Sequence, residues 1–393
     1  MSALPSVVSD ATEPAPGRSP CLLLLLNDSA FFVTHRLPVA LAAKAAGYDV
    51  HVATAPGAGV SAIVASGLTH HPIPLSRSGT TIAGELRTLR GIWQLFRRLR
   101  PDIVHCVTIK PVLYGGIMAR ITRVPALICA VSGMGFVFLT QGLRAQLRRA
   151  AVCAMYRLSL GHRNLTLIFQ NPDDRQELLA MLGSESVRAV IIRGSGVDLA
   201  QYPIVARLEA SRPVVVMASR LLTDKGVREF VDAARHLRIG GSAATFRLAG
   251  DVDSNPASIS TAELDRWRTE GAVEVLGFRS DVAALFADCD VVVLPSYREG
   301  LPRVLIEAAA CGRAVVTTDV PGCRDAIEPA VTGVLVPARD AVALAEAIGL
   351  LIRDRTLCRR MGAEGRALAE RAFTIEAVIA SHLRVYREAI ATA

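Results

Sequence analysis

The sequence predicts an α/β protein made of two doubly wound, mostly parallel sheets in two domains. Short apolar runs of strand length alternate with amphipathic helical stretches along the whole chain, which is the pattern of a parallel sheet covered by helices. A chain of 393 residues is long enough for two such domains. No Gly-x-Gly-x-x-Gly follows the first strand, so a conventional dinucleotide-binding domain is not favoured.

The predicted elements fall into two groups along the chain. Strands are expected at 21–26, 48–54, 102–107, 126–131, 165–170 and 190–193, and then at 214–217, 245–249, 273–276, 290–295 and 333–337. A loop at 27–38 precedes a helix that ends at Gly47, and a second helix covers 86–99. Further helices begin near Asn171, Asp281, Pro302 and Asp340, which are residues that favour a helix start. The last helix spans 376–391.

These elements predict the domain organisation. Residues 1–19, rich in Ser, Pro and Ala, are expected to form a disordered tail without the layout of a signal peptide. The first domain covers 20–205 and the second covers 206–375, with a linker at 194–203. No apolar run reaches the ~20 residues that a membrane-spanning helix needs, so the protein is expected in the cytoplasm.

Cysteine usage and charge limit the function classes. The eight cysteines are scattered without a Cys-x-x-Cys pair, so a disulfide framework or a zinc site is not expected. The segment 86–163 holds 13 basic residues and one acid, Asp102. Such a segment predicts contact with an anionic surface. Apolar residues at 136–139 beside a basic helix favour docking on a membrane, although such helices also often face water and such aromatic residues often fill a core.

The stretch 296–322 carries the clearest chemical signal. It follows the strand 290–295 and places Glu299 and Glu307 eight positions apart, with Pro302 expected as the first residue of a helix. A strand that ends in a glycine-containing loop and opens a helix directs backbone N–H groups toward an anion such as phosphate. The two carboxylates can accept hydrogen bonds from the hydroxyl groups of a sugar.

A second loop of this kind follows the strand 214–217. Arg220 and Lys225 flank it, and Gly226 precedes the next helix, so two cations and free N–H groups converge. This arrangement suits a diphosphate, which arginine can bind through two hydrogen bonds. The pair Asp251 and Asp253 could suggest a metal site, but the two cations already supply positive charge, and no metal is expected.

In the first domain, several residues follow strand ends, where ligands bind in open α/β sheets. They are the candidate ligand contacts Ser29, His35, Arg36, Lys110, Ser132 and Gly133. His35 could equally be a surface residue at a helix end, and Lys110 could be a solvated loop residue. Gly133 and Gly135 would allow a ligand to approach the backbone closely.

The frame EGLPRVLIEAAACGRAVV, with Glu299-x7-Glu307, together with Arg220-x4-Lys225-Gly226, resembles the donor site of family 4 glycosyltransferases. The resemblance covers about 20–390 and implies two Rossmann-like domains of GT-B architecture, whose last helix, here 376–393, returns to the first domain. It implies that Glu299 contacts the transferred sugar, that Glu307 binds the ribose and that Arg220 and Lys225 bind the diphosphate. Further donor contacts would come from Gly277, Phe278, Arg279, Gly300, Leu301, Pro302 and Arg303. The candidate ligand contacts of the first domain would lie on the acceptor side of the cleft. Some members carry a histidine near Ser132 and Gly133; this chain does not, so the role of that histidine is not carried over.

By this resemblance we expect a retaining, metal-independent glycosyltransferase that needs no cofactor. It would move an N-acetylhexosamine, GalNAc or GlcNAc, or else glucose or galactose, from a UDP-sugar. The acceptor would be an undecaprenyl-diphosphate-linked saccharide of cell-surface polysaccharide, reached from the inner face of the plasma membrane, and nucleic acid is not an expected partner. The alternatives are a UDP-sugar 2-epimerase of the same architecture, which needs no acceptor surface, and a non-catalytic scaffold that binds nucleotide-sugars.

Overall fold

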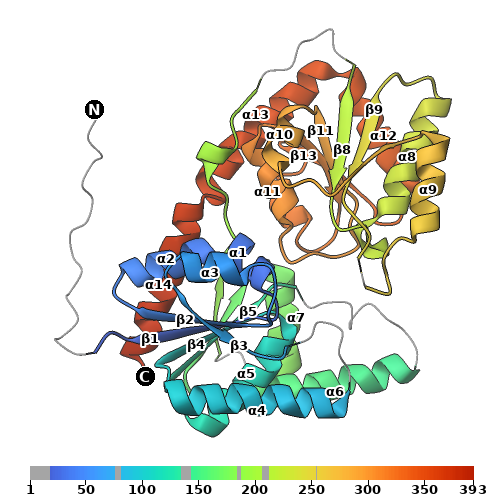
Figure 1. Ribbon diagram of the computed structural model, residues 1–393. Helices are drawn as coiled ribbons and strands as arrows, with labels where there is room; N and C mark the ends of the chain where they lie inside the picture. The colour runs from blue at the N-terminus through green and yellow to red at the C-terminus, as the bar shows by residue number, and fades with distance from the viewer. Residues whose placement is uncertain (1–17, 76–80, 134–142, 184–186, 206–211, 254) are drawn as a thin grey trace, which may run out of the picture.

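The protein folds into two α/β lobes, each built on a parallel sheet with helices on both faces (Figure 1). This arrangement is seen in a computed structural model that describes residues 18–75, 81–133, 143–183, 187–205, 212–253 and 255–393. The predicted fold class, two doubly wound parallel sheets, is confirmed.

The first lobe contains a seven-stranded sheet in the order β3-β2-β1-β4-β5-β6-β7. Its strands are β1 (Cys21–Leu25), β2 (Asp49–Thr54), β3 (Thr69–Pro72), β4 (Ile103–Val107), β5 (Ala126–Val131), β6 (Leu165–Phe169) and β7 (Arg188–Ile191). Its helices are α1 (Ser29–His35), α2 (Leu37–Ala45), α3 (Val60–Ala65), α4 (Ile82–Leu99), α5 (Ile109–Thr122), α6 (Leu143–Leu160) and α7 (Pro172–Leu182).

The leucines of β1 explain why this strand is central and fully apolar. Successive side chains of a strand point to opposite faces, so Leu22 and Leu24 enter the core under α1 and α2, whereas Leu23 and Leu25 enter the core under α4 and α5. A parallel strand with helices on both faces has no solvated side, and every residue of β1 is accordingly buried.

The second lobe contains a six-stranded sheet in the order β10-β9-β8-β11-β12-β13. Its strands are β8 (Val214–Ala218), β9 (Thr245–Ala249), β10 (Glu274–Gly277), β11 (Val291–Leu294), β12 (Ala314–Thr318) and β13 (Gly333–Val336). Its helices are α8 (Val227–Ile239), α9 (Thr261–Glu270), α10 (Val282–Ala287), α11 (Arg303–Ala310), α12 (Ala341–Arg353) and α13 (Arg355–Ala372). One continuous hydrophobic core joins the sheet to these helices.

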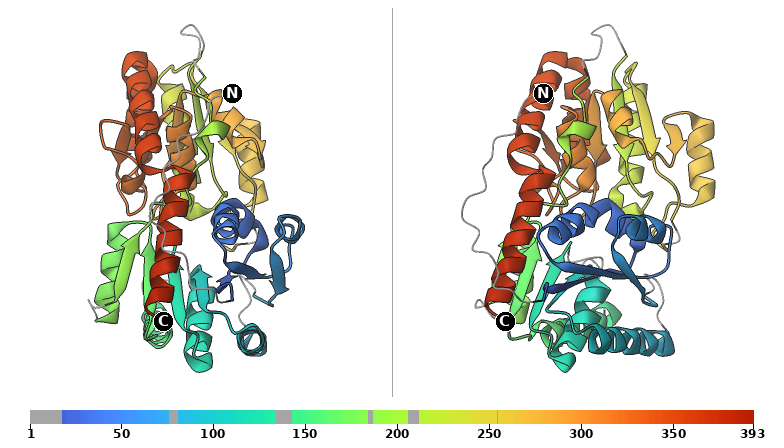
Figure 2. Two further views of the ribbon diagram at one scale, coloured as in Figure 1. Left: turned by 90° about the vertical axis from the view of Figure 1, so that its left-hand side faces the viewer. Right: turned by 60° about the vertical axis from the view of Figure 1, so that its left-hand side comes forward.

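The last helix, α14 (Ile375–Ala391), leaves the second lobe and packs against the first (Figure 1; Figure 2). It lies against α2 and approaches β4 and β5. Val378, Val385 and Tyr386 fill the core on this face, and the Tyr386 hydroxyl lies 2.8 Å from Nδ1 of His105 on β4. The helix therefore ties the end of the chain to the centre of the first sheet.

Several predicted boundaries differ from those observed. The predicted loop at 27–38 contains α1, and the chain turns at Arg36 before α2, where Pro38 lies in the first turn. Pro302 is the N-cap residue of α11 rather than its first helical residue. The strand expected at 190–193 is β7, which ends at Ile191, and α4 begins at Ile82, four residues before the predicted start. Strands β3 and β12 were not predicted.

Some predictions fall at or beyond the edges of the described structure. Most of the predicted tail at 1–19 and the apolar segment 136–139 lie outside the described residues. The predicted boundary near 205 lies between β7 and β8 and stays a prediction. Among the helices that the structure describes, none is both long enough and apolar enough to cross a bilayer.

Two buried histidines under α14 make stability sensitive to acid. Burial lowers the pKa of His382 to about 3 and that of His105 well below its usual range, and the positive charge of the buried Arg36 adds to both effects. An unfolded histidine titrates near pH 6.5, so below that pH the unfolded chain binds protons that the folded protein does not. The free energy of unfolding therefore falls as the pH drops from about 6.5 toward 3, by up to about 1.4 kcal/mol per histidine and pH unit.

Urea unfolding at a series of pH values between about 7.5 and 5 tests this expectation. His382→Leu should reduce the slope of the free energy of unfolding against pH by up to about 1.4 kcal/mol per pH unit, which corresponds to one bound proton. An unchanged slope in the His382→Leu variant would contradict the assignment.

Candidate active site

The two sheets bring their topological switch points to one cavity. The strand order reverses between β1 and β4 in the first sheet and between β8 and β11 in the second. Open α/β sheets bind ligands beyond the carboxyl ends of the strands at such points. A cavity of about 460 Å³ is lined by residues from all four following loops, including Asn27, Thr108, Arg220 and Glu299. Two sheets that could each bind a ligand therefore share one hollow.

The loop after β8 carries the two predicted cations. Lys225 ends a short 3-10 turn (Thr223–Lys225), and Gly226 adopts a positive φ of 72° as it opens α8. A Cβ atom at Gly226 would lie 2.1 Å from the carbonyl oxygen of Pro295, so only glycine fits against the end of β11. The amide of Tyr297 donates to the carbonyl of Asp224 at 2.8 Å. The loops after β8 and β11 are thus fixed to each other.

Lys225 and Glu299 form an ion pair inside this junction. The Lys225 Nζ lies 2.5 Å from Glu299 Oε1, and only 15% and 13% of the two side chains are exposed. The hydroxyl of Ser296 donates to the same carboxylate oxygen at 2.7 Å. The two groups come from different loops, and the sequence predicted both as site residues without predicting that they pair.

Arg220 is held more loosely. Its guanidinium lies 3.5 Å from the carboxylate of Asp253, and 53% of its side chain is exposed. An exposed ion pair at this distance contributes little free energy, so the guanidinium can turn toward an anion at low cost. Arg220 lines both the central cavity and a second hollow of about 650 Å³, which residues of the second lobe line together with Asp28 of the first. It therefore lies where the two hollows meet.

The second hollow joins several of the predicted donor contacts. Phe278, Arg279, Val304 and Glu307 are among the residues that line it. Phe278 is 74% exposed, which is a large exposed apolar surface for one residue. Arg279 pairs with Asp281. A flat aromatic surface beside polar groups is suited to a heterocyclic base.

Glu307 lies in a fixed polar network. It is buried on α11, and its Oε1 accepts hydrogen bonds from the hydroxyl of Tyr202 at 2.7 Å and from Nε of Arg303 at 2.8 Å. Arg303 also donates to the carbonyl of Thr34 in the first lobe. The network places the carboxylate at the edge of the second hollow and connects the two lobes through one arginine.

The first lobe supplies the opposite wall of the cavity. Lys110, Ser132 and Gly133, three of the candidate contacts, follow β4 and β5 and line it. Lys110 forms an ion pair with Glu85 at 2.7 Å, and the buried hydroxyl of Ser132 has no hydrogen-bond partner among the residues that the structure describes. A buried hydroxyl without a partner is costly, so a ligand group that bonded to it would relieve that cost.

Sequence reasoning missed Asn27 and Thr108 on this wall. Thr108 has a φ of 74°, which is strained for a β-branched residue, and its hydroxyl donates to Asn27 Oδ1 at 3.2 Å. Strain of this kind gathers at functional sites. The only sequence signal for either residue was its place directly after a buried strand.

The other candidate acceptor contacts are not part of the cavity lining. Ser29 is buried and its hydroxyl accepts the amide of Gly59 at 3.2 Å, and Arg36 is buried with its guanidinium on the carbonyl of His35. Nδ1 of His35 lies 3.0 Å from the hydroxyl of Ser195, and burial lowers the pKa of His35 to about 3, so this imidazole is neutral. Acceptor contacts by these three residues stay predictions.

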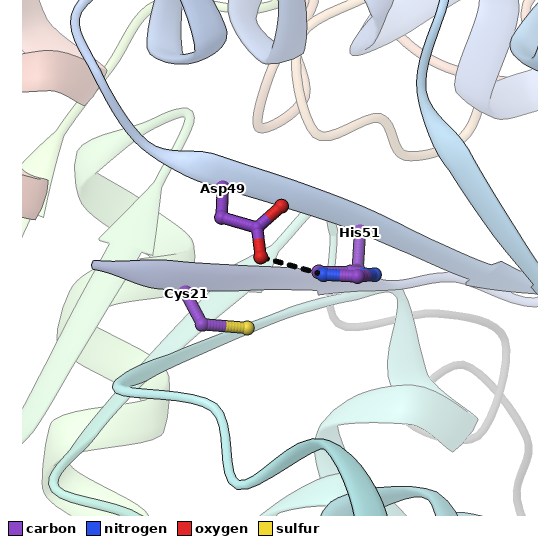
Figure 3. A group of neighbouring side chains, drawn as sticks. All are labelled: Cys21, Asp49 and His51. Carbon is purple, nitrogen blue, oxygen red and sulfur yellow. Dashed lines mark hydrogen bonds and ion pairs between the residues drawn. The ribbon is translucent and has the colours of Figure 1, made fainter. Parts of the chain in front are cut away.

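One group of possible metal ligands lies elsewhere. Cys21, Asp49 and His51 share one face at the beginning of β1 and β2 (Figure 3). Nε2 of His51 lies at hydrogen-bond distance, 3.1 Å, from Oδ2 of Asp49. These strand ends are opposite to the ends that meet the cavity. Neither Asp251 nor Asp253 belongs to such a group among the described residues, and Asp253 faces Arg220 instead.

Comparisons with known proteins agree with this geometry. Residues 22–171 match the family model described as glycosyl transferase 4-like, and residues 212–354 match that described as glycosyl transferases group 1. The chain is 33% identical over 276 residues to the N,N'-diacetylbacillosaminyl-diphospho-undecaprenol alpha-1,3-N-acetylgalactosaminyltransferase of Campylobacter jejuni, which covers 67% of this chain and 71% of that protein. It is 23% identical over 300 residues to the UDP-Gal:alpha-D-GlcNAc-diphosphoundecaprenol alpha-1,3-galactosyltransferase of Escherichia coli, covering 72% and 75%.

Solved structures share the fold. Anabaena HepE in complex with UDP and glucose has a TM-score of 0.72 at 21% identity, covering 94% of this chain and all of that one. WaaG, a glycosyltransferase involved in lipopolysaccharide biosynthesis, has a TM-score of 0.68 at 15% identity, covering 93% and 99%. Two facing parallel-sheet lobes with these matches define a glycosyltransferase of GT-B architecture. The chain belongs to the group 1, or family 4, glycosyltransferases.

Proposed function

We propose that the protein transfers an N-acetylhexosamine, or else a hexose, from a UDP-sugar to an undecaprenyl-diphosphate-linked saccharide in cell-surface polysaccharide synthesis. The observation that carries the proposal is the single cavity that Arg220 and Glu299 of one lobe share with Lys110 and Ser132 of the other. A donor subsite and an acceptor subsite on facing walls are what a transfer between two substrates needs. An epimerase or a binding scaffold would not need the second wall.

The charges of the second lobe support a nucleoside diphosphate donor. Arg220 lies where the central cavity meets the hollow that Phe278 and Glu307 line, so a diphosphate at that junction would connect a base and ribose on one side with a sugar on the other. Lys225 supplies a second cation near the same point. The Escherichia coli relative is named as a transferase that uses UDP-Gal, and HepE, which shares this fold, forms a complex with UDP; both support uracil as the base.

We propose that these two cations perform electrostatic catalysis without a metal ion. The bond between the anomeric carbon and the UDP oxygen breaks, and negative charge develops on the departing diphosphate, where Arg220 and Lys225 would stabilise it. The acceptor hydroxyl would attack from the same face, forming the new glycosidic bond with retention and passing its proton to the leaving phosphate oxygen. This step requires no enzymic nucleophile. Glu299 would bind hydroxyl groups of the transferred sugar, and Glu307 would bind the ribose.

The similarity to the Campylobacter jejuni N-acetylgalactosaminyltransferase is the basis for the acceptor and for GalNAc as the first donor to test. An acceptor on a polyprenyl chain lies in a membrane, so the enzyme would work as a peripheral protein on the inner face of the plasma membrane. The surface of α4 supports this location. Ile82, Leu86 and Trp93 are exposed apolar residues on a helix that also exposes four arginines, namely Arg87, Arg90, Arg97 and Arg98.

Replacing the two residues of the central ion pair should separate their roles. Glu299→Ala is expected to reduce transfer at least about 10²-fold while UDP still binds. The sugar hydroxyl groups lose the carboxylate that accepts their hydrogen bonds, but the diphosphate keeps both of its cations. Lys225→Ala is expected to weaken both UDP binding and transfer. The assay uses UDP-GalNAc, UDP-GlcNAc, UDP-glucose and UDP-galactose with an undecaprenyl-diphosphate-linked monosaccharide, with and without EDTA, and UDP affinity is measured by calorimetry.

Each rival function predicts a different result in this assay. Release of a free sugar epimer without an acceptor would indicate the epimerase, and UDP binding without turnover of any donor would indicate the scaffold. Full transfer by Glu299→Ala would contradict the sugar-binding role of that residue. Loss of transfer in EDTA would contradict metal independence. Arg266→Glu, an exposed position on α9 far along the chain from these loops, serves as the control variant.

Replacing the apolar residues of α4 should release the protein from membranes. Wild-type protein is expected to float with vesicles that contain phosphatidylglycerol, and Leu86→Ser/Trp93→Ser should lower the bound fraction at least about tenfold, because each side chain contributes roughly 1.5–3 kcal/mol when buried. UDP affinity should not change. Arg266→Glu/Arg268→Glu on the second lobe is the matched control, and equal flotation of the α4 variant and the wild type would refute α4 as the docking surface.

A further inference from the structure

A buried ion pair fixes the loop that carries Glu299 to the first lobe. Arg298, the residue before Glu299, donates from Nη2 to Asp174 Oδ1 at 2.5 Å and to Glu177 Oε2 at 2.6 Å. Both acids lie on α7 of the first lobe. Asp174 is fully buried and 16% of the Arg298 side chain is exposed. The contact therefore lies at the interface between the lobes rather than on their surface.

Hydrogen bonds at the beginning of α7 hold the carboxylate of Asp174 in place. Asn171 caps the helix by accepting the amide of Asp174 at 2.8 Å, and its own amide nitrogen donates to Asp174 Oδ2 at 2.9 Å. The same amide nitrogen donates to the carbonyl of Gly300 at 2.6 Å. The two neighbours of Glu299 are thus both held by α7 and its cap. Asn171 binds the backbone carbonyl of Gly300, and Asp174 binds the side chain of Arg298.

The loop that carries Glu299 also packs tightly against the first lobe at Gly300. A Cβ atom at Gly300 would lie 2.5 Å from Oε1 of Gln170 and 2.8 Å from the backbone of Ser132. Gly133 is in van der Waals contact with the loop, since a Cβ atom at Gly133 would lie 3.4 Å from the amide nitrogen of Gly300. The loop therefore rests directly on Ser132 and Gly133, which line the acceptor wall of the cavity.

We propose that Arg298 and Asp174 are positioning residues that set where Glu299 lies relative to the acceptor wall. This inference rests on the proposed function, because it assigns the pair to the transfer step. Removing two charges from water is costly, and a buried ion pair is seldom a source of net stability. Its hydrogen bonds are instead satisfied in only one relative position of two surfaces, namely the loop that carries Arg298 and Glu299 and the beginning of α7.

The neighbouring ion pair provides a matched comparison. Arg324 and Asp173 join the same two lobes one residue earlier on α7, at 3.5 Å, with 39% and 41% of their side chains exposed. Exposed pairs at such a distance contribute little free energy. Loss of the buried pair, Arg298–Asp174, should therefore lower turnover, whereas loss of the exposed pair, Arg324–Asp173, should not.

Arg298→Met and Asp174→Asn are the test variants, and Arg324→Met is the control. Both test variants are expected to lower kcat about 10²-fold, the loss that a displacement of about 1 Å at the reacting groups can cause. UDP affinity and the donor KM should stay within about threefold, because Arg220 and Lys225 are untouched. The double variant should lose no more than the worse single variant, Arg298→Lys should recover part of kcat, and Arg324→Met should stay within about threefold of wild type.

Small-angle scattering gives a readout that does not depend on turnover. With UDP bound, Arg298→Met should show a larger radius of gyration than wild type and Arg324→Met, because the lobes are no longer held in register. Wild-type kcat in Arg298→Met, a loss confined to donor KM, or an unchanged radius of gyration would each overturn the proposal. If the wild type transfers no sugar to lipid-linked acceptors, the proposed function fails, and the scattering comparison alone decides the role of the pair.

Discussion

The ion pair between Lys225 and Glu299 is the interaction on which the rest of the site depends. It lies between two loops of the second lobe at a point that is mostly shielded from water, and each charge compensates the other. A cation as shielded from water as Lys225 would be costly without a partner, and so would a carboxylate as shielded as Glu299. A diphosphate could replace Glu299 as the partner of Lys225, which would free the carboxylate to accept hydrogen bonds from sugar hydroxyls. Binding of the donor would then itself prepare the sugar-binding group.

The topology explains why these groups meet at all. Each sheet has one switch point, and the loops that follow the strands beside it diverge to leave room for a ligand. In the second lobe these loops carry Arg220, Lys225 and Glu299, and in the first they carry Asn27 and Thr108. The contacts of Gly300 and Arg298 with α7 bring the two sets together. Family membership follows from sequence, but the shared cavity follows from this docking of one lobe on the other.

The loops that line the cavity from the second lobe were easier to recognise in the sequence than those from the first lobe. The frame around Glu299 and Glu307 and the Arg220-x4-Lys225-Gly226 loop are local patterns, since strand, loop and helix follow one another directly and leave few possible conformations. The segment 27–38 was expected to be a loop, yet Phe32 packs in the core and makes the segment helical. Strand β3 was missed because Thr69–Pro72 has two adjacent histidines instead of an apolar run.

What the sequence could not supply are partners that lie far away along the chain. Ser29 and Arg36 follow a strand end, as a ligand contact should, but their side chains turn into the core. Glu85 as the partner of Lys110, Asp253 as the partner of Arg220 and Asp174 as the partner of Arg298 depend on packing between separate elements. No local pattern encodes a distance between residues that lie 25 to 124 positions apart.

A crystal structure with bound UDP would test the central claim most directly. The account predicts the diphosphate at the junction of the two hollows, with its oxygens about 2.7–3.2 Å from the guanidinium of Arg220 and from Nζ of Lys225. Glu299 would then face the central cavity. Diphosphate bound elsewhere, with Lys225 still paired to Glu299 and Arg220 still facing Asp253, would contradict it.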